Sequence, residues 1–222
     1  MKNHAERLAA FAACSLYPVV SSEFCAGRSV PEVISAIAAG GAKIVQLREK
    51  HRSDADLFAL ARKCREITAA AGMLLIIDDR LDIALGCGAD GAHLGQEDFP
   101  VAEARKLAPE LLLGSSTHNA AEIAAAQAAG TSYLNIGPIY PTQTKSVSCG
   151  ALGIGMLKEL APRVRCPLSV MGGIKSRHLP ELCRCGAKHI AMVTEITTAP
   201  DIAAKVRSLL AEIRAAADGP SH

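Results

Sequence analysis

Residues 43–77 read KIVQLREKHRSDADLFALARKCREITAAAGMLLII. The two ends of this stretch, Lys43–Leu47 and Leu74–Ile77, are short apolar, β-branched runs that are typical of strands buried on both faces. Between them, Asp54–Ala71 has apolar residues at three- and four-residue spacing and is followed by Gly72, which predicts an amphipathic helix with a glycine C-cap. A strand, a helix and a second strand in this order predict a parallel βαβ unit.

The same unit recurs along the 222 residues of the chain. Further strands are expected at Leu16–Val20, Gly91–Leu94, Leu111–Gly114, Tyr133–Ile136, Leu168–Met171 and His189–Val193. Further helices are expected at Val30–Ala39, Val101–Leu107, Ala120–Ala129, Ile154–Leu160, His178–Cys185 and Asp201–Ala217. Eight strands that alternate with helices predict an α/β fold, a single-domain (β/α)8 TIM barrel over residues 1–217, and residues 218–222 are expected to be a disordered tail. The alternative is an open doubly wound sheet, but the GxGxxG turn of dinucleotide-binding sheets does not follow the first strand.

Composition restricts the class of protein and its partners. Half of the residues are apolar, and the net charge of +2 shows no basic excess of the kind that marks a nucleic-acid surface. No stretch approaches the roughly 20 apolar residues of a membrane span, and Glu6 stands where a signal peptide would be basic. The eight cysteines form no CxxC pair, which favours reduced thiols in a cytoplasmic protein. We therefore expect a cytoplasmic protein with small-molecule partners, without nucleic acid or membrane, and leave a homo-oligomer open.

In a (β/α)8 barrel, function lies where the strands end and the following loops begin. Gln46-Leu47-Arg48-Glu49-Lys50 stands at the end of the second expected strand. Strand alternation places Gln46, Arg48 and Lys50 on one side. An amide and two cations on one side suit an anionic ligand such as phosphate, because arginine offers a planar fork and lysine a point charge. The alternative is a solvated loop with an Arg–Glu pair.

Carboxylates follow the next two expected strands. Asp78-Asp79-Arg80 follows the third strand, and Gly95-Gln96-Glu97-Asp98 follows the fourth. Carboxylates at neighbouring strand ends can share a hard cation, and Mg²⁺ prefers one or two carboxylates together with water and phosphate oxygens. The sequence therefore predicts a metal-bridged pyrophosphate site. Alternatively, Asp98 caps the next helix and Asp79 pairs with Arg80.

The remaining strand ends also carry polar or glycine-rich segments. Gly114-Ser115-Ser116-Thr117-His118 follows the fifth strand, and His118 could act as an acid or a base. Residues 137–145, GPIYPTQTK, follow the sixth strand and are expected to form a ligand loop. Gly172-Gly173-Ile174 and Val193-Thr194-Glu195 follow the last two strands, whose backbone N–H groups frequently bind phosphate in barrels of this kind.

Together these motifs resemble those of the thiamin phosphate synthase family over nearly the whole chain. The resemblance rests on QLREK at 46–50, DGAHLGQED at 90–98, GPIYPTQTK at 137–145 and the Gly172-Gly173-Ile174 turn. It implies a (β/α)8 barrel that joins 4-amino-2-methyl-5-pyrimidine methyl diphosphate to a thiazole phosphate and releases pyrophosphate with Mg²⁺.

The resemblance also implies roles for individual residues. It implies that Gln46, Arg48, Lys50, Ser116 and Lys145 hold the pyrimidine substrate, with Arg48, Lys50, Lys145 and Ser116 as the catalytic set. It implies that Asp79 and Asp98 bind Mg²⁺, and that Thr142, Thr144, Gly173, Val193 and Thr194 hold the thiazole phosphate. Leu47, Glu49, Asp78 and Gln143 are further expected substrate contacts.

Three departures from the family pattern affect this expectation. The first expected strand with the next residue, Leu16–Ser21, lacks the family's usual Thr-Asp ending. The family usually has Asn at the position of Asp78 and a small residue at the position of Glu195. An extra carboxylate beside a phosphate weakens binding unless it is protonated, holds metal or points away. Two other functions therefore remain open, a thiazole tautomerase that uses His118 and a non-catalytic barrel that binds phosphorylated ligands.

The proposed chemistry needs charge stabilisation more than a nucleophile. Carbon–oxygen cleavage leaves a resonance-stabilised pyrimidine methyl cation, so the cost lies in the charge that develops on the departing pyrophosphate. Mg²⁺, Arg48, Lys50 and Lys145 are expected to stabilise that charge. No protein nucleophile is needed, so the cysteines should be dispensable for catalysis.

Overall fold

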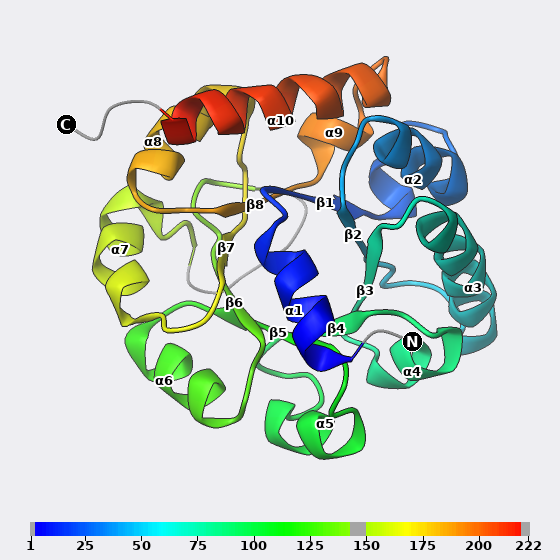
Figure 1. Ribbon diagram of the computed structural model, residues 1–222, viewed down its shortest axis with the longest axis horizontal. Coiled ribbons are helices and arrows are strands. Elements are labelled where there is room, and N and C mark those ends of the chain that lie inside the picture. The colour runs from blue at the N-terminus through cyan, green and yellow to red at the C-terminus, as the bar shows by residue number, and fades with distance from the viewer. Residues whose placement is uncertain (1–2, 143–149, 219–222) are drawn as a thin grey trace.

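The computed structural model describes residues 3–142 and 150–218, and these residues form a closed (β/α)8 barrel (Figure 1). Its parallel strands are β1 (Leu16–Val20), β2 (Ile44–Leu47), β3 (Leu74–Asp78), β4 (Gly91–Leu94), β5 (Leu112–Thr117), β6 (Tyr133–Ile136), β7 (Leu168–Val170) and β8 (His189–Met192). They pair in sequence order, and β8 closes the sheet on β1. The closed sheet confirms the predicted fold class and rules out the open doubly wound alternative.

Helices surround the barrel, except for the first helix, which lies across one end of it (Figure 1). The helices are α1 (His4–Ala12), α2 (Val30–Ala39), α3 (Asp54–Ala70), α4 (Leu81–Cys87), α5 (Val101–Leu107), α6 (Ala120–Ala128), α7 (Gly153–Leu160), α8 (Leu179–Arg184), α9 (Thr194–Thr197) and α10 (Ile202–Asp218), with 3-10 turns η1 (Ser22–Phe24), η2 (Ala161–Arg163) and η3 (Ser176–His178). α1, α4 and α9 were not among the helices expected from the sequence. Among the described residues, no helix is long and apolar enough to cross a membrane.

Several element ends differ from the sequence-based expectation. β5 does not stop at Gly114 but continues to Thr117, because Ser116 and Thr117 keep pairing with Asn135 and Ile136 of β6. Ser116 is therefore a strand residue whose direction the sheet fixes. The last helix includes Asp218, the residue at which the disordered tail was expected to begin, and residues 219–222 lie outside the described part.

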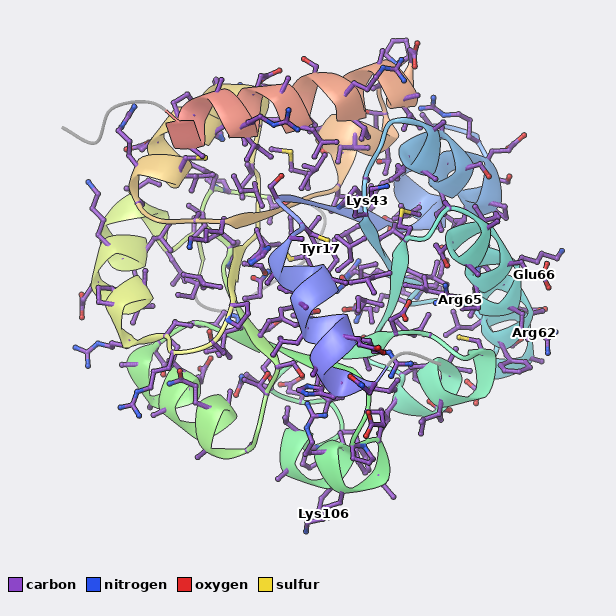
Figure 2. All side chains as sticks on the ribbon, viewed as in Figure 1. Tyr17, Lys43, Arg62, Arg65, Glu66 and Lys106 are labelled. Carbon is purple, nitrogen blue, oxygen red and sulfur yellow. The ribbon has the colours of Figure 1, made fainter. Side chains whose placement is uncertain are left out.

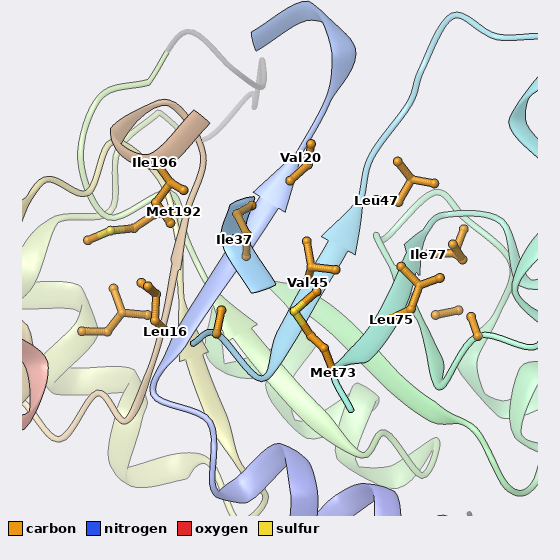
Figure 3. Close-up of a cluster of buried hydrophobic side chains, with 14 of the residues drawn as sticks. Leu16, Val20, Ile37, Val45, Leu47, Met73, Leu75, Ile77, Met192 and Ile196 are labelled. Atoms are coloured by element: carbon orange, nitrogen blue, oxygen red, sulfur yellow. The ribbon is translucent and has the colours of Figure 1, made fainter. Parts of the chain in front are cut away.

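The core has two parts, one on each face of the sheet. The larger cluster lies between strands and helices, and Figure 3 shows strand residues such as Leu16, Val45, Leu47 and Leu75 within it. The smaller cluster fills the barrel interior, where Phe11 of α1 stacks on Tyr133 at a ring-centroid distance of 4.3 Å. Because α1 fills the end of the barrel at which the strands begin, ligands have access from the end at which the strands finish.

Candidate active site

The QLREK segment divides its side chains between the two faces of β2. Gln46 lies in the barrel interior with 1% of its surface exposed, and its Nε2 donates to the Tyr17 hydroxyl at 3.2 Å. Its Oε1 is buried and has no hydrogen-bond partner within the described part of the chain. Leu47 packs on the opposite face, in the core under the helices. Gln46 thus offers an unused acceptor at the site, whereas the Leu47 side chain contributes to packing.

Arg48 and Lys50 both pair with the last residue of β3. Arg48 Nε lies 3.4 Å from Asp78 Oδ2, and Lys50 Nζ lies 3.3 Å from the same oxygen. Lys50 also forms an ion pair with Asp79. Burial by itself lowers the pKa of Lys50, but the neighbouring Asp78 and Asp79 carboxylates outweigh it, so that the pKa is raised. The structure therefore brings the two predicted cations together on one side of the segment.

Glu49 has different partners from its neighbours in the segment. Its carboxylate accepts from the backbone N–H and hydroxyl of Ser22, both at 2.7 Å, and pairs with Arg52 at 3.1 Å. The pairing of Arg48 with Glu49 that was considered from sequence is wrong, because the side chains point to opposite sides as strand alternation requires. Glu49 anchors the loop after β2 to the loop after β1.

The carboxyl groups of Asp79 and Asp98 meet at the ends of β3 and β4. Asp79 has a φ of 60°, a region that non-glycine residues seldom adopt, and its N–H donates to the His93 carbonyl at 2.8 Å. Asp98 Oδ2 accepts the Gly95 N–H at 2.6 Å. Burial, followed by the hydrogen bond with Asp79, raises the pKa of Asp98. The two carboxyl groups share the single positive charge of Lys50, so negative charge is in excess here.

Both alternative roles for these aspartates are wrong. Arg80 pairs with Asp54 and Asp82, both at 2.6 Å, and not with Asp79. The N-cap residue of α5 is Pro100, so Asp98 closes its own loop onto Gly95 rather than capping the helix.

The Asp79–Asp98 pair fits Mg²⁺. Across residues 3–142 and 150–218, no group of three or more His, Cys, Asp or Glu side chains converges into a metal site. A pair of carboxyl groups suits Mg²⁺, which binds through one or two carboxylates, water and substrate phosphates. The raised pKa of Asp98 agrees with this fit, because burial and the neighbouring Asp79 carboxyl group outweigh the attraction of Lys50.

Ser116 and His118, both predicted for the site, have separate surroundings. Ser116 Oγ lies 3.0 Å from His93 Nε2, and the Gln96 amide donates to the Ser116 carbonyl at 2.5 Å. His118 Nδ1 lies 2.8 Å from Glu122 Oε2 of α6, which also accepts the His118 backbone N–H. The sheet directs Ser116 into the barrel interior, whereas the hydrogen bond to Glu122 holds the His118 imidazole against α6.

The loops after β6 and β7 lie against one another. Ile139 N donates to Met171 O at 2.8 Å, and Tyr140 N donates to Gly172 O at 3.0 Å. Gly173 has a φ of 62°, and a Cβ there would collide with the Pro141 carbonyl, so only glycine allows this approach. The contact sets the direction in which the chain runs to the half-buried Thr142, and the predicted Gln143, Thr144 and Lys145 lie outside the described residues.

The negative charge of Glu195, which lies where the loop after β8 begins, is balanced by two lysines. Its carboxylate lies 2.9 Å from Lys205 Nζ and 3.3 Å from Lys175 Nζ, and it accepts the Ser176 hydroxyl at 2.9 Å. Burial would raise the pKa of Glu195, but the hydrogen bonds from Lys205 and Ser176 outweigh it and lower the pKa to about 2. Lys175 Nζ also lies 3.4 Å from Thr194 Oγ1. The end of β8 therefore keeps a net positive charge despite Glu195.

A family model for thiamine monophosphate synthase matches residues 16–196, which is most of the barrel just described. The chain belongs to the thiamine monophosphate synthase family. It is 40% identical over 199 residues to the thiamine-phosphate synthase of Pelotomaculum thermopropionicum, a match that covers 89% of this chain and 91% of that protein. It is 41% identical over 196 residues to the thiamine-phosphate synthase of Chloroflexus aurantiacus, covering 88% and 91%.

A solved structure agrees with this membership. Thiamine phosphate pyrophosphorylase from Pyrococcus furiosus superposes with a TM-score of 0.83 at 27% identity, covering 91% of this chain and 96% of that one. As a member of the thiamine monophosphate synthase family, the chain is a transferase enzyme of thiamine biosynthesis.

Sequence reasoning missed four side chains that bear on this synthase-family site. Tyr17, His93 and Tyr133 are buried in the barrel interior. Tyr17 bonds to Gln46, His93 bonds to Ser116, and Tyr133 bonds to both Tyr17 and His93. Lys175 lies beside Thr194. A signal existed for His93, because it is the one polar side chain in the four-residue strand GAHL. Nothing in the sequence around Tyr17 or Tyr133 distinguishes a tyrosine whose hydroxyl forms hydrogen bonds from one that only packs in the core.

Proposed function

We propose that the enzyme couples 4-amino-2-methyl-5-pyrimidine methyl diphosphate with a thiazole phosphate to give thiamin phosphate and pyrophosphate. The observation that carries the proposal is the arrangement of Arg48 and Lys50 beside the Asp79–Asp98 pair at the ends of three successive strands. Cations for a diphosphate and a carboxylate pair for Mg²⁺ are what a departing pyrophosphate requires. Membership in the thiamine monophosphate synthase family supports the same reaction.

The reaction proceeds by dissociation in this proposal. The bond between the pyrimidine methylene carbon and the diphosphate oxygen breaks, and its electron pair leaves with the diphosphate. Arg48 and Lys50 bind the diphosphate and stabilise its growing negative charge, together with Lys145 by family resemblance. Asp79 and Asp98 would hold Mg²⁺, which would supply further positive charge to the leaving group when bound. The thiazole nitrogen then donates its lone pair to the methylene cation, and no protein base or nucleophile is needed.

The rest of the site positions the two rings. Gln46 and Ser116 lie in the barrel interior and would hold the pyrimidine ring through the amide oxygen and the hydroxyl. The thiazole phosphate would bind at the ends of β7 and β8 through the backbone at Gly173, Val193 and Thr194. Lys175, 3.4 Å from Thr194 Oγ1, adds a cation there. Thr142 and Thr144 belong to this end by family resemblance.

The location of the reaction is also part of the proposal. We place it in the cytoplasm, and the free thiols of Cys25, Cys64 and Cys87, all buried, support a reducing compartment.

One assay tests the reaction. The protein is incubated with both substrates, with and without Mg²⁺, and thiamin phosphate is followed by mass spectrometry. Product that depends on Mg²⁺ supports the synthase, and absence of product beside an active control enzyme overturns it. Isomerisation of a thiazole carboxylate phosphate that is lost in His118→Ala would support a tautomerase instead. Binding of both substrates without turnover would support the non-catalytic barrel.

The leaving-group residues give a second test. Arg48→Ala and Lys145→Ala should each lower turnover by about 100-fold, because each removes a charge that acts mainly on the departing pyrophosphate. Arg52→Ala is the matched control, since Arg52 pairs with Glu49 in the same loop and should change turnover less than twofold. Full activity in both Arg48→Ala and Lys145→Ala would contradict the site.

A further inference from the structure

A continuous series of hydrogen bonds crosses the barrel interior from β2 to β5. Gln46 Nε2 lies 3.2 Å from the Tyr17 hydroxyl, which lies 2.8 Å from the Tyr133 hydroxyl. The Tyr133 hydroxyl lies 3.1 Å from His93 Nδ1, and His93 Nε2 lies 3.0 Å from Ser116 Oγ. None of the five residues, which we call the interior network, exceeds 8% exposure. Figure 2 shows Tyr17 beside α1 and within the ring of strands, in contrast to Arg62 and Lys106 at the outer surface.

The positions of the protons follow from counting donors. Burial raises the pKa of both Tyr17 and Tyr133, so both hydroxyls keep their single proton. With the Gln46 amide oriented as in the structure, Tyr17 accepts from Gln46 and directs its own proton to Tyr133, so that the Tyr133 proton points to His93 Nδ1. In this arrangement His93 accepts at Nδ1 and donates from Nε2 to Ser116. All hydrogen bonds of the interior network therefore run in one direction.

The two ends of the interior network lie in the proposed pyrimidine site and have opposite character. At β2, Gln46 Oε1 is a buried acceptor without a partner among the described residues. At β5, the Ser116 hydroxyl accepts from His93, so its own proton remains to donate to a ligand. An aminopyrimidine matches this arrangement, because its amino group donates and its ring nitrogens accept. The corresponding oxo compound reverses both roles, since its carbonyl accepts and its ring N–H donates.

We propose that Tyr17, Tyr133 and His93 are positioning residues that fix Gln46 as the acceptor and Ser116 as the donor, and so select an aminopyrimidine over its oxo analogue. The proposal rests on the proposed function for the identity of the ring. To reverse the direction of these hydrogen bonds, the Gln46 amide would have to flip so that its oxygen and nitrogen exchange places, and every proton between Gln46 and Ser116 would have to move at once. Gly114 provides the necessary space, because a Cβ there would lie 2.5 Å from His93 Nδ1 and overlap the Tyr133 ring.

The tautomer of His93 is the direct test, and it does not depend on turnover. Two-bond ¹H–¹⁵N correlation spectra of the full-length protein, labelled at its seven histidines, distinguish Nδ1–H from Nε2–H. His93→Gln assigns the resonance. We expect the Nε2–H form, and Tyr133→Phe should remove this preference. An Nδ1–H imidazole or an imidazolium at His93 would overturn the proposal.

Substrate selection provides the second test. The wild-type protein should bind the amino substrate about 100-fold more tightly than the oxo analogue, since the reversed pattern leaves two buried groups unpaired. Tyr133→Phe should raise KM for the pyrimidine substrate about tenfold and reduce that preference, with KM for the thiazole substrate unchanged within twofold. A Tyr133→Phe protein that keeps the full preference would overturn the proposal.

A matched variant separates positioning from simple loss of core packing. His189 of β8 is as buried as His93 but bonds to the Cys14 carbonyl outside the interior network. His93→Gln should lose the amino preference, and His189→Gln should keep it. Equal losses in the two variants would show a structural effect and overturn the proposal. A protein that forms no thiamin phosphate but holds His93 as Nε2–H and prefers the aminopyrimidine would overturn the proposed function while supporting this inference.

Discussion

The two sides of the barrel mouth carry opposite balances of charge. At the ends of β2 to β4, three carboxylates, Asp78, Asp79 and Asp98, lie around two cations, Arg48 and Lys50. At the ends of β7 and β8, two lysines, Lys175 and Lys205, share the single carboxylate of Glu195. Negative charge is therefore in excess on the first side, and positive charge is in excess on the second side.

The pKa values of the carboxyl groups on the two sides of the barrel mouth are shifted in opposite directions. The pKa of Asp98 is raised by burial and by Asp79, whereas the pKa of Glu195 is lowered to about 2 despite its burial, through Lys205 and Ser176. A site that lacks positive charge favours a cation, and a site with excess positive charge favours an anion. In line with the proposed function, we therefore propose that Mg²⁺ and the diphosphate bind on the first side and the monophosphate on the second. The predictions that follow test this division.

The largest effect is expected on the carboxylate-rich side. Asp98→Asn removes half of the carboxylate pair and should lower Mg²⁺-dependent turnover by about 100-fold, with weaker Mg²⁺ binding in calorimetry. Asp82→Asn is the control, because Asp82 pairs with Arg80 on the surface of α4 and should leave both quantities unchanged. Unchanged Mg²⁺ affinity in Asp98→Asn would contradict the assignment of the metal to this side.

A smaller effect is expected on the lysine-rich side. Lys175→Met should raise KM for the thiazole phosphate about tenfold, because Lys175 contacts Thr194 as well as Glu195. Lys205→Met removes the other lysine, which bonds to Glu195 and Ser176, and should raise KM less than threefold. Both variants should leave KM for the pyrimidine substrate unchanged. Equal effects of the two variants would mean that Lys175 acts only through Glu195.

Asp78→Asn should reduce the difference in charge balance between the two sides of the barrel mouth. Asp78 pairs with both Arg48 and Lys50, so removal of its charge should strengthen the hold of these cations on a diphosphate. We expect KM for the pyrimidine substrate to fall by about threefold, as a modest electrostatic effect at a partly solvated site. A higher KM in a variant with unchanged thermal stability would show that Asp78 helps to bind the substrate.

The smallest effect concerns acid stability. The folded pKa of Glu195, about 2, is below its ordinary value of 4.5, so its ion pairs stabilise the protein above about pH 4.5 and are lost as the pH falls toward 2. Because the lysines are partly exposed, the contribution should be of the order of 1 kcal/mol. Urea unfolding at pH 7 and pH 3 should therefore separate wild type from Glu195→Gln at pH 7 and bring them closer at pH 3. A constant difference between the two pH values would contradict the ion pairs.

Sequence patterns predicted the repeated units well, because strands buried on both faces and amphipathic helices leave different periodicities. The eight strands were each found within a few residues, and β5 was the least accurate. The extension of β5 to Thr117 depends on pairing with β6, and no local preference of Ser-Ser-Thr predicts it. The first helix was missed because its role depends on Phe11, which packs on residues far away in the sequence.

The site was only partly accessible from sequence. Alternation within one strand indicated that Gln46, Arg48 and Lys50 share a side, and adjacent strand ends indicated that Asp79 and Asp98 lie close together. The hydrogen-bond partners across the barrel interior could not be predicted from the sequence, because the Tyr17–Tyr133 contact joins residues 116 positions apart. For the same reason the sequence raised the question of Glu195 but could not answer it, because its two lysines come from the residue before η3 and from α10.

A crystal structure of the protein with Mn²⁺, pyrophosphate and the thiazole phosphate would test the division of the mouth most directly, because the anomalous signal of Mn²⁺ locates the metal. The account predicts the metal between Asp79 and Asp98, pyrophosphate against Arg48 and Lys50, and the monophosphate beside Thr194 and Lys175. A metal bound elsewhere, or pyrophosphate on the lysine-rich side with the monophosphate at Arg48, would contradict it.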